Sequence, residues 1–178
     1  EPTRCGFVAL IGAPNAGKST LLNQLVGAKI SIVSRKVQTT RTQVRGIALS
    51  GTAQIIFVDT PGIFAPKRRL DRAMVTSAWG GATDADLIGV LIDVSRFDHE
   101  ENTALLEKLS ELKQPKFLIL NKIDTVAKEK LLEITAKVNE RGQFEATFMV
   151  AALTGYGVKD ILTWLEKRLL LGPWLYRS

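Results

Sequence analysis

The sequence predicts an α/β fold, with a mostly parallel six-stranded sheet, one antiparallel strand and helices on both faces. Short apolar, β-branched runs alternate with stretches whose apolar residues recur at helical spacing. Parallel strands need helical crossovers, and these crossovers cover both faces of the sheet. One link breaks the alternation, because Leu49 and Gln54 are separated only by Ser-Gly-Thr-Ala, which indicates a hairpin. The length of 178 residues favours one well-cored domain over two.

The elements follow one another along the whole chain. The expected strands, in order, are Phe7–Ile11, Val44–Leu49, Gln54–Val58, Leu87–Asp93, Lys116–Leu120 and Thr147–Val150. Helical spacing of apolar residues is found in 20–25, 105–112, 131–138 and 158–169. Gly172-Pro173 should end the last helix. We therefore expect one domain over 1–170, with 171–178 as the start of a linker or a tail.

Composition excludes several classes of protein. Hydrophobic residues make up 46% and charged residues 24% of the chain, as in soluble globular proteins rather than disordered ones. Cys5 is the one cysteine, so an internal disulfide is impossible and a reducing compartment is expected. No apolar run is as long as a membrane-spanning helix, and the first residues do not resemble a signal peptide. A cytoplasmic location is therefore expected.

The net charge of +6 is unevenly distributed. The segment 29–72 holds nine basic residues against two acidic ones, so it carries the whole excess. A basic block of this kind suits a polyanionic partner, either RNA or an anionic lipid surface. The alternative is a solvated face close to a phosphate ligand. DNA is not expected as a partner.

A glycine-rich segment follows the first expected strand and matches the phosphate-binding pattern G-x-x-x-x-G-K-[ST] from Gly12 to Ser19. Backbone N–H groups of such a loop and the N-terminus of the next helix surround phosphates. Lys18 would neutralise the β and γ phosphates, and the Ser19 hydroxyl would bind Mg²⁺. The expected nucleotide contacts of this segment are Asn15, Ala16, Gly17, Lys18, Ser19 and Thr20.

A second motif indicates which base is bound. Asn121-Lys-Ile-Asp124 follows an expected strand and resembles the N-K-x-D motif of the GTPase superfamily. The Asp124 carboxylate would accept from the N1–H and the 2-amino group of guanine, and adenine lacks this pair of donors. The resemblance implies that Lys122 packs along the base and that Asn121 braces the loop.

Two further segments resemble the switch regions of GTPases. Asp59-Thr-Pro-Gly62 resembles D-x-x-G, in which Asp59 would hold Mg²⁺ through a water and the Gly62 N–H would sense the γ-phosphate. In the polar stretch before it, the family pattern favours Thr40 over Thr39 as the threonine that completes the Mg²⁺ shell. The alternative is that both are ordinary loop hydroxyls. The expected catalytic residues are Lys18, Thr40 and Gly62.

The loop after the last expected strand departs from the GTPase pattern. Ser-Ala-x is usual there, and this chain has Ala151-Ala152-Leu153. A backbone contact between Ala152 and the guanine oxygen would survive, but hydroxyl bracing from residue 151 is absent. We expect weaker nucleotide affinity and an unchanged preference for guanine.

Taken together, the motifs resemble the Era family of bacterial GTPases from about Gly6 to Leu170. G-x-P-N-x-G-K-S-T-L-L-N, S-R-K-x-Q-T-T-R and D-T-P-G-I carry the resemblance, and Gln38-Thr-Thr-Arg41 is its most specific part. Der and MnmE share the other motifs. The resemblance implies a G domain that hydrolyses GTP slowly and acts in small ribosomal subunit assembly and 16S rRNA maturation. It also implies a C-terminal RNA-binding KH domain, and we expect this sequence to be the G domain alone, because no KH-type G-x-x-G loop follows the GTPase motifs.

Two questions stay open in the sequence. Ile63 stands where Ras-like GTPases have a water-orienting glutamine, so hydrolysis would depend on Mg²⁺, Lys18 and backbone groups. Asn15 matches the asparagine that binds K⁺ in potassium-activated relatives, or it only shapes the loop. The alternative function is a nucleotide-gated interaction module at a membrane or protein surface, including peripheral contact with the inner membrane, or a Der- or MnmE-like GTPase.

Overall fold

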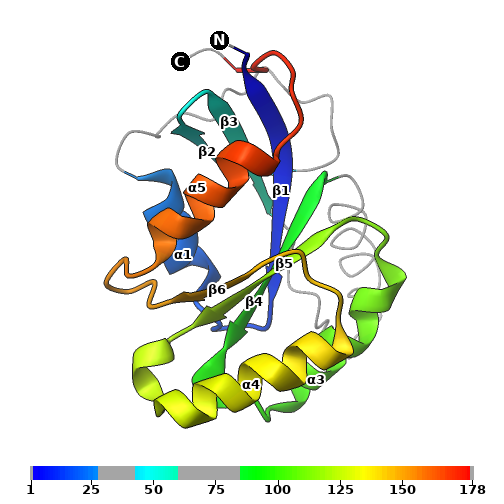
Figure 1. Ribbon diagram of the computed structural model, residues 1–178, viewed down its shortest axis with the longest axis vertical. Helices are drawn as coiled ribbons and strands as arrows, with labels where there is room; N and C mark the ends of the chain where they lie inside the picture. Colours follow the sequence, from blue (N-terminus) through cyan, green and yellow to red (C-terminus); the bar gives the residue numbers. More distant parts are fainter. Residues whose placement is uncertain (1, 28–42, 60–84, 177–178) are drawn as a thin grey trace.

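A six-stranded mixed sheet forms the centre of the molecule (Figure 1). The computed structural model describes residues 2–27, 43–59 and 85–176. The strands are β1 (Arg4–Gly12), β2 (Gln43–Ser50), β3 (Ala53–Asp59), β4 (Leu87–Asp93), β5 (Lys116–Asn121) and β6 (Thr147–Val150). Their order across the sheet is β2-β3-β1-β4-β5-β6, and only the β2–β3 pair is antiparallel. The predicted fold class is confirmed.

The antiparallel pair is the predicted hairpin. Gly51 and Thr52 alone separate the two strands. Gly51 has a φ of 58°, a left-handed conformation that suits a two-residue hairpin and that glycine adopts without steric cost. The hairpin places β2 at one edge of the sheet and β3 next to β1.

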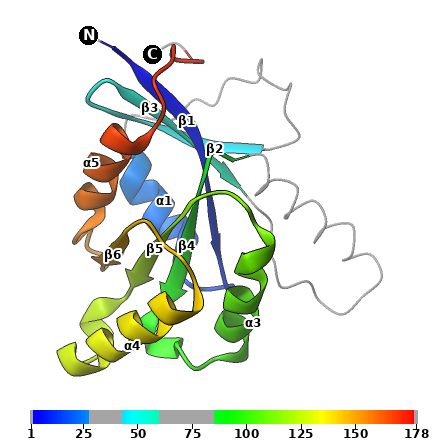
Figure 2. The ribbon, with the colours of Figure 1, turned by 45° about the vertical axis from the view of Figure 1, so that its right-hand side comes forward.

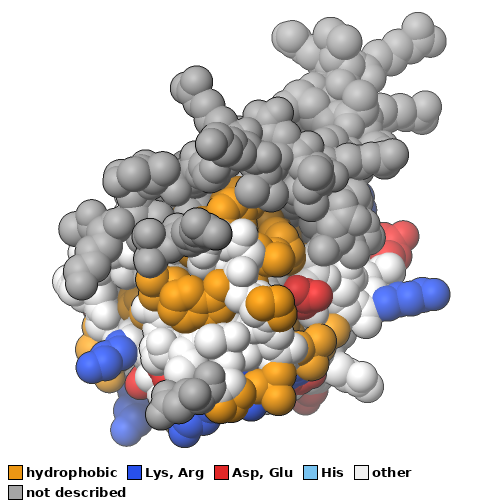
Figure 3. Space-filling view, turned by 90° about the horizontal axis from the view of Figure 1, so that it is seen from above, with side chains coloured by type: hydrophobic (Ala, Val, Ile, Leu, Met, Phe, Trp, Pro, Cys, Tyr) orange, Lys and Arg blue, Asp and Glu red, His pale blue; other side chains and the backbone are white. Residues whose placement is uncertain are grey.

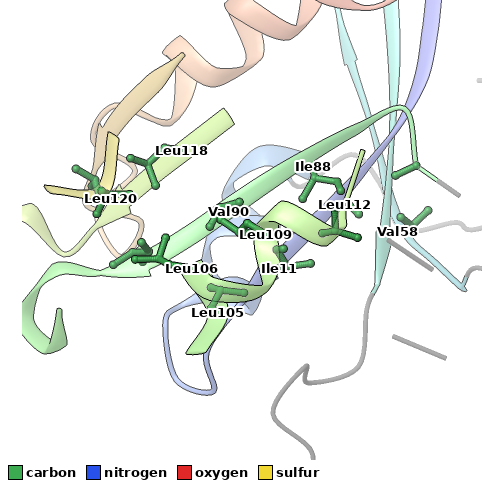
Figure 4. Packing of buried hydrophobic residues seen from close by; sticks show 14 of the residues in the cluster. Ile11, Val58, Ile88, Val90, Leu105, Leu106, Leu109, Leu112, Leu118 and Leu120 are labelled. Atoms are coloured by element: carbon green, nitrogen blue, oxygen red, sulfur yellow. The ribbon is translucent and has the colours of Figure 1, made fainter. Parts of the chain in front are cut away.

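Helices cover the two faces of the sheet in pairs, as Figures 1 and 2 show. The helices are α1 (Lys18–Val26), α3 (Glu100–Lys108), α4 (Lys128–Arg141) and α5 (Val158–Arg168), with 3₁₀ turns η1 (Val94–Arg96), η2 (Leu109–Glu111) and η3 (Ile123–Thr125). Leu21 of α1 and Leu165 of α5 belong to one buried cluster. Leu105 of α3 and Ile134 of α4 belong to the other cluster, part of which is drawn in Figure 4.

Polar ends of the strands position the site. All seven residues of β4 are buried, as expected for a parallel strand covered on both faces, and the strand ends at Asp93. Asp93 pairs with Asn121 of β5, and Asp59 of β3 pairs with Leu10 of β1. The carboxyl-terminal ends of these parallel strands lie along the same side of the sheet, and ligands of open α/β sheets bind beyond such strand ends.

The segment after α5 lies against the sheet. The Gly172 N–H donates to Thr3 O at 3.0 Å, and the Trp174 Nε1–H donates to Thr52 O at 2.9 Å. Tyr176 is buried in the core, whereas Leu171 and Leu175 are exposed. Figure 3 looks at the molecule from the side of the two termini and shows hydrophobic side chains on this face. A segment expected to be a linker or a tail is therefore packed on the domain.

Within the described part of the chain, no helix combines the length and the apolar character needed to cross a membrane.

Candidate nucleotide-binding site

The loop between β1 and α1 has the backbone geometry that phosphate binding requires. Asn15 and Gly17 have φ angles of 68° and 100°, so the loop turns tightly before α1 begins at Lys18. A side chain at position 17 would collide with the Asn121 amide, so this position accepts only glycine. The first turn of α1 contains no acidic residue. The partial positive charge of the helix N-terminus is therefore available to an anion.

The residues expected to contact phosphate and Mg²⁺ come from α1 and the end of β3. Lys18 and Ser19 line a small recess that also includes Arg45 and Val58. Val58 directly precedes Asp59, the last residue of β3. A serine hydroxyl and an aspartate are oxygen donors of the kind that Mg²⁺ prefers, so the residues present fit this ion.

Two of the expected catalytic residues, Thr40 and Gly62, lie outside the described residues, as do eight of the nine basic residues of the segment 29–72. Of Asp59 the structure describes the backbone only. Their roles stay predictions.

A pocket for the base lies between the phosphate-binding loop of residues 12–19 (the P-loop) and the ends of β5 and β6. Its volume is about 200 Å³. It is lined by the P-loop and helix α1, the N-K-x-D segment and the loop after β6, namely Gly17, Thr20, Asn121, Lys122, Asp124, Thr125, Ala151, Ala152, Leu153 and Thr154. Asp124 lies in η3 and is exposed at this pocket. Three motifs that are far apart in the sequence thus converge on one cavity.

Asn121 joins the three segments. Its side chain is only 2% exposed. Its Nδ2 donates to Ala16 O at 2.9 Å, and its Oδ1 accepts from the Ala152 N–H at 2.9 Å. Both bonds are buried, and leaving either partner unpaired would be costly. The structure therefore gives Asn121 a bracing position between the P-loop and the loop after β6.

This arrangement bears on the predicted contact of Ala152 with the guanine oxygen. The Ala152 N–H already donates to Asn121, so a base could receive it only in competition with that bond. The Ala151 N–H donates to Tyr156 O, and the Thr154 and Gly155 N–H groups donate to Ala151 O. The Leu153 N–H, next to Ala152 at the pocket, is a backbone donor for which the described residues provide no acceptor. Leu153 is therefore the better candidate for this contact.

Asp93 is a site residue that the motifs did not reveal. It is 4% exposed, and its Oδ2 lies 2.9 Å from Lys122 Nζ. Burial opposes ionisation of Asp93, but hydrogen bonds from Ser95 and Lys122 outweigh it and lower the pKa of the carboxyl below its usual value. The available signal was a charged residue that ends an otherwise apolar strand.

A larger cavity of about 620 Å³ opens at the other end of β5, beside Lys113, Lys116 and Arg141. Burial lowers the pKa of Lys116, and its Nζ donates to Leu112 O at 2.6 Å and Gln114 O at 3.0 Å. Lys113 follows η2, and Arg141 ends α4, so both lie where positive charge complements the last carbonyl groups of a helix. None of the motif residues lines this cavity, so we assign the nucleotide to the smaller pocket.

Comparison with known proteins agrees with this assignment. The family described as 50S ribosome-binding GTPase matches residues 7–122, a range that contains the P-loop, Asp59 and Lys122. The chain belongs to this GTPase family. The match extends over most of the sheet and includes both the phosphate loop and the start of the base-recognition segment.

Individual members of the family are similar along nearly the whole chain. GTPase Era of Rhizobium meliloti (strain 1021) is 62% identical over 175 residues, which cover 98% of this chain and 56% of the relative. The chain thus spans little more than half the length of this curated relative. Two Era structures, each 33% identical, cover 98% of this chain and 60% of their own. One, from Aquifex aeolicus, is bound to GDP·AlF4⁻ (TM-score 0.80). The other is bound to MgGDPNP and nucleotides 1506–1542 of 16S ribosomal RNA (TM-score 0.82).

Proposed function

We propose that this chain is a Mg²⁺-dependent G domain that binds GTP and hydrolyses it to GDP and phosphate. The observation that carries the proposal is the convergence of the P-loop, Asp124 and the loop after β6 on one pocket, with Asn121 bonded to both loops. Era relatives bound to GDP·AlF4⁻ and to MgGDPNP support the same ligand class.

The proposed chemistry combines the positions of the described residues with the roles that the motifs predict for Asp59, Thr40 and Gly62. Asp124 would accept from guanine, and the α1 N-terminus and Lys18 would bind the phosphates. Mg²⁺, held by Ser19 together with Asp59 and Thr40, would supply positive charge at the β and γ phosphates. A water attacks the γ-phosphorus, the bond to the β–γ bridging oxygen breaks, and GDP leaves with that oxygen. Gly62 would report the loss of the γ-phosphate through its N–H. Without a glutamine at position 63, intrinsic turnover should be slow.

We further propose that the domain acts in the cytoplasm in small ribosomal subunit assembly and 16S rRNA maturation. The similarity to an Era bound to a 16S rRNA segment supports this role, as does the +6 net charge. Because the curated relatives are longer than this chain, most of the RNA contact would come from a C-terminal KH domain of the full-length protein. Residues 1–170 would be the G domain and 171–178 the start of the connection.

Two measurements test these proposals separately. Phosphate release from GTP should require Mg²⁺ and fall at least about a hundredfold in Lys18→Ala, whereas no release from the wild-type chain would contradict the enzymatic role. The full-length protein should co-sediment with small ribosomal subunits in its GTP state. Co-sedimentation with anionic vesicles alone would favour the membrane module instead.

Potassium activation is a finer proposal. Asn15 adopts a left-handed conformation in the P-loop, with φ 68°, and its carbonyl oxygen accepts from Lys122 Nζ at 3.2 Å. Its side-chain oxygen would be the K⁺ ligand, where an arginine finger acts in other GTPases. Turnover should be faster in KCl than in NaCl of the same ionic strength, and Asn15→Ala should abolish the difference. Equal wild-type rates in the two salts would exclude the role.

A further inference from the structure

Both oxygens of the buried Asp93 carboxylate accept hydrogen bonds from neighbouring residues. Its Oδ1 accepts from the Ser95 N–H at 2.9 Å and from the Ser95 hydroxyl. Its Oδ2 accepts from Lys122 Nζ at 2.9 Å. The bonds from Ser95 leave the carboxylate little freedom to rotate, so they fix the direction in which it receives the lysine.

Lys122 is held at both of its ends. Its backbone is left-handed, with φ 65°, and it directly precedes the turn η3 that carries Asp124. A non-glycine residue pays a cost for this conformation, so surrounding contacts must maintain it. Its ammonium group bonds to Asp93 and also to Asn15 O at 3.2 Å. One ammonium thus connects the end of β4, the P-loop and the segment that begins η3.

We propose that Asp93 is a positioning residue for guanine recognition: by holding the Lys122 ammonium, it fixes the lysine stem as one wall of the base pocket and keeps η3 oriented so that Asp124 faces the base. This inference rests on the proposed function, because it assigns a role within the guanine pocket. Lys122 and Asp124 both line that pocket, whereas Asp93 does not. Asp93 therefore acts through Lys122 and not by contact with the nucleotide.

The negative charge of Asp93 allows its positioning role to be distinguished from a simple electrostatic effect on the nucleotide. A carboxylate close to the P-loop repels phosphates, so its removal would strengthen nucleotide binding if repulsion were its main effect. If its main effect is to position Lys122, its removal weakens binding, since the ammonium keeps only the Asn15 carbonyl and the lysine stem becomes mobile. The two accounts predict opposite changes in affinity.

The first test is Asp93→Asn, which keeps an oxygen for Ser95 and removes the charge that holds Lys122. The affinity for GDP should fall about tenfold, the size expected for one lost charge-assisted hydrogen bond. Asp98→Asn is the matched control, because Asp98 lies in the same connection after β4 and is exposed. Its GDP affinity should stay within about twofold of wild type. Unchanged or tighter GDP binding by Asp93→Asn would overturn the proposal.

The second test is a double-mutant cycle that combines Asp93→Asn with Lys122→Met. It distinguishes a role through Lys122 from a merely structural role of Asp93. In the Lys122→Met background, adding Asp93→Asn should cost no further affinity for GDP, because there is no ammonium left to position. The same loss in both backgrounds would show that Asp93 acts independently of Lys122. If Asp93→Asn does not fold, Lys122→Met alone tests the pair by removing the ammonium group. Full GDP affinity of the Lys122→Met variant would overturn the inference.

These outcomes are distinguishable from failure of the proposed function. A wild-type chain that does not bind GDP contradicts the function itself. A wild-type chain that binds GDP, with Asp93→Asn binding equally well, contradicts only the role of Asp93.

Discussion

The side chain of Gln54 pairs with the backbone of Tyr176 in both directions. Its Nε2 donates to Tyr176 O at 2.8 Å, and its Oε1 accepts from the Tyr176 N–H at 3.1 Å. The same oxygen accepts from the Leu175 N–H at 2.9 Å. Gln54 is 1% exposed, so its amide group is almost cut off from bulk water and depends on these partners. The last described residues are thus joined to β3, the strand that ends at Asp59 in the candidate site.

Replacing Gln54 by leucine should destabilise the domain. Gln54→Leu keeps the side-chain size but removes the partners of two backbone N–H groups and one carbonyl. We expect a loss of about 1–3 kcal/mol in the free energy of unfolding, measured by chemical denaturation. Gln143→Leu is the control, because Gln143 is exposed, and its loss should be under about 0.5 kcal/mol. Equal losses in the two variants would contradict the role of Gln54.

Cys5 should report whether the segment around Tyr176 is docked. Burial raises the pKa of the Cys5 thiol above its ordinary value, so less reactive thiolate is present at any given pH. Cys5 packs against the cluster that contains Tyr176, so in Tyr176→Ala the thiol should gain contact with water. Its pKa should then fall towards the ordinary value, and labelling by a disulfide reagent should be faster at pH 8. The midpoint of the rate against pH should move to lower pH.

The exposed Tyr156 provides a matched control for this labelling experiment. Tyr156→Ala should leave both the rate and its pH midpoint unchanged. Identical pH profiles for Tyr176→Ala and wild type would contradict docking of the segment over Cys5.

Asp124→Asn should change the base that is preferred. An amide offers one acceptor and one donor group in place of two acceptor oxygens, so it matches xanthine better than guanine. We expect the ratio of XDP to GDP affinity to rise at least about a hundredfold, measured by competition with a fluorescent nucleotide. A ratio equal to that of wild type would refute the assignment of Asp124.

Ala151→Ser should improve nucleotide affinity. Ala151 is buried at the base pocket, and a hydroxyl there would brace the loop after β6. One added hydrogen bond corresponds to about two- to tenfold tighter GDP binding. Calorimetric titration checks this, and weaker binding would show that the site has no room for the hydroxyl.

Local patterns were sufficient for the elements and the motifs, as β4 illustrates. Its run of apolar residues between a polar start and Asp93 allowed both ends of the strand to be predicted. The P-loop could be predicted equally well, because its glycines and Lys18 have a fixed spacing between a strand and a helix. Both predictions depend on residues that are close in the sequence.

Pairings between distant residues could not be predicted in this way. Gln54 looked like an ordinary strand residue, and nothing local indicates that its partners lie 121 and 122 residues away. Likewise, the contact of Asp93 with Lys122 follows only once β4 and β5 are known to be neighbours. The contact of the Ala152 N–H with the base stays a prediction, and its competing acceptor, Asn121, could not be seen from the local pattern.

The central claim is that the pocket beside Asp124 selects guanine. The most direct measurement is displacement of a fluorescent GDP from the wild-type chain, in Mg²⁺, by unlabelled GDP and by ATP. A site built to pair with guanine donors should release the probe to GDP at a concentration at least about a thousandfold lower than to ATP. Displacement by ATP at a similar concentration would contradict the claim.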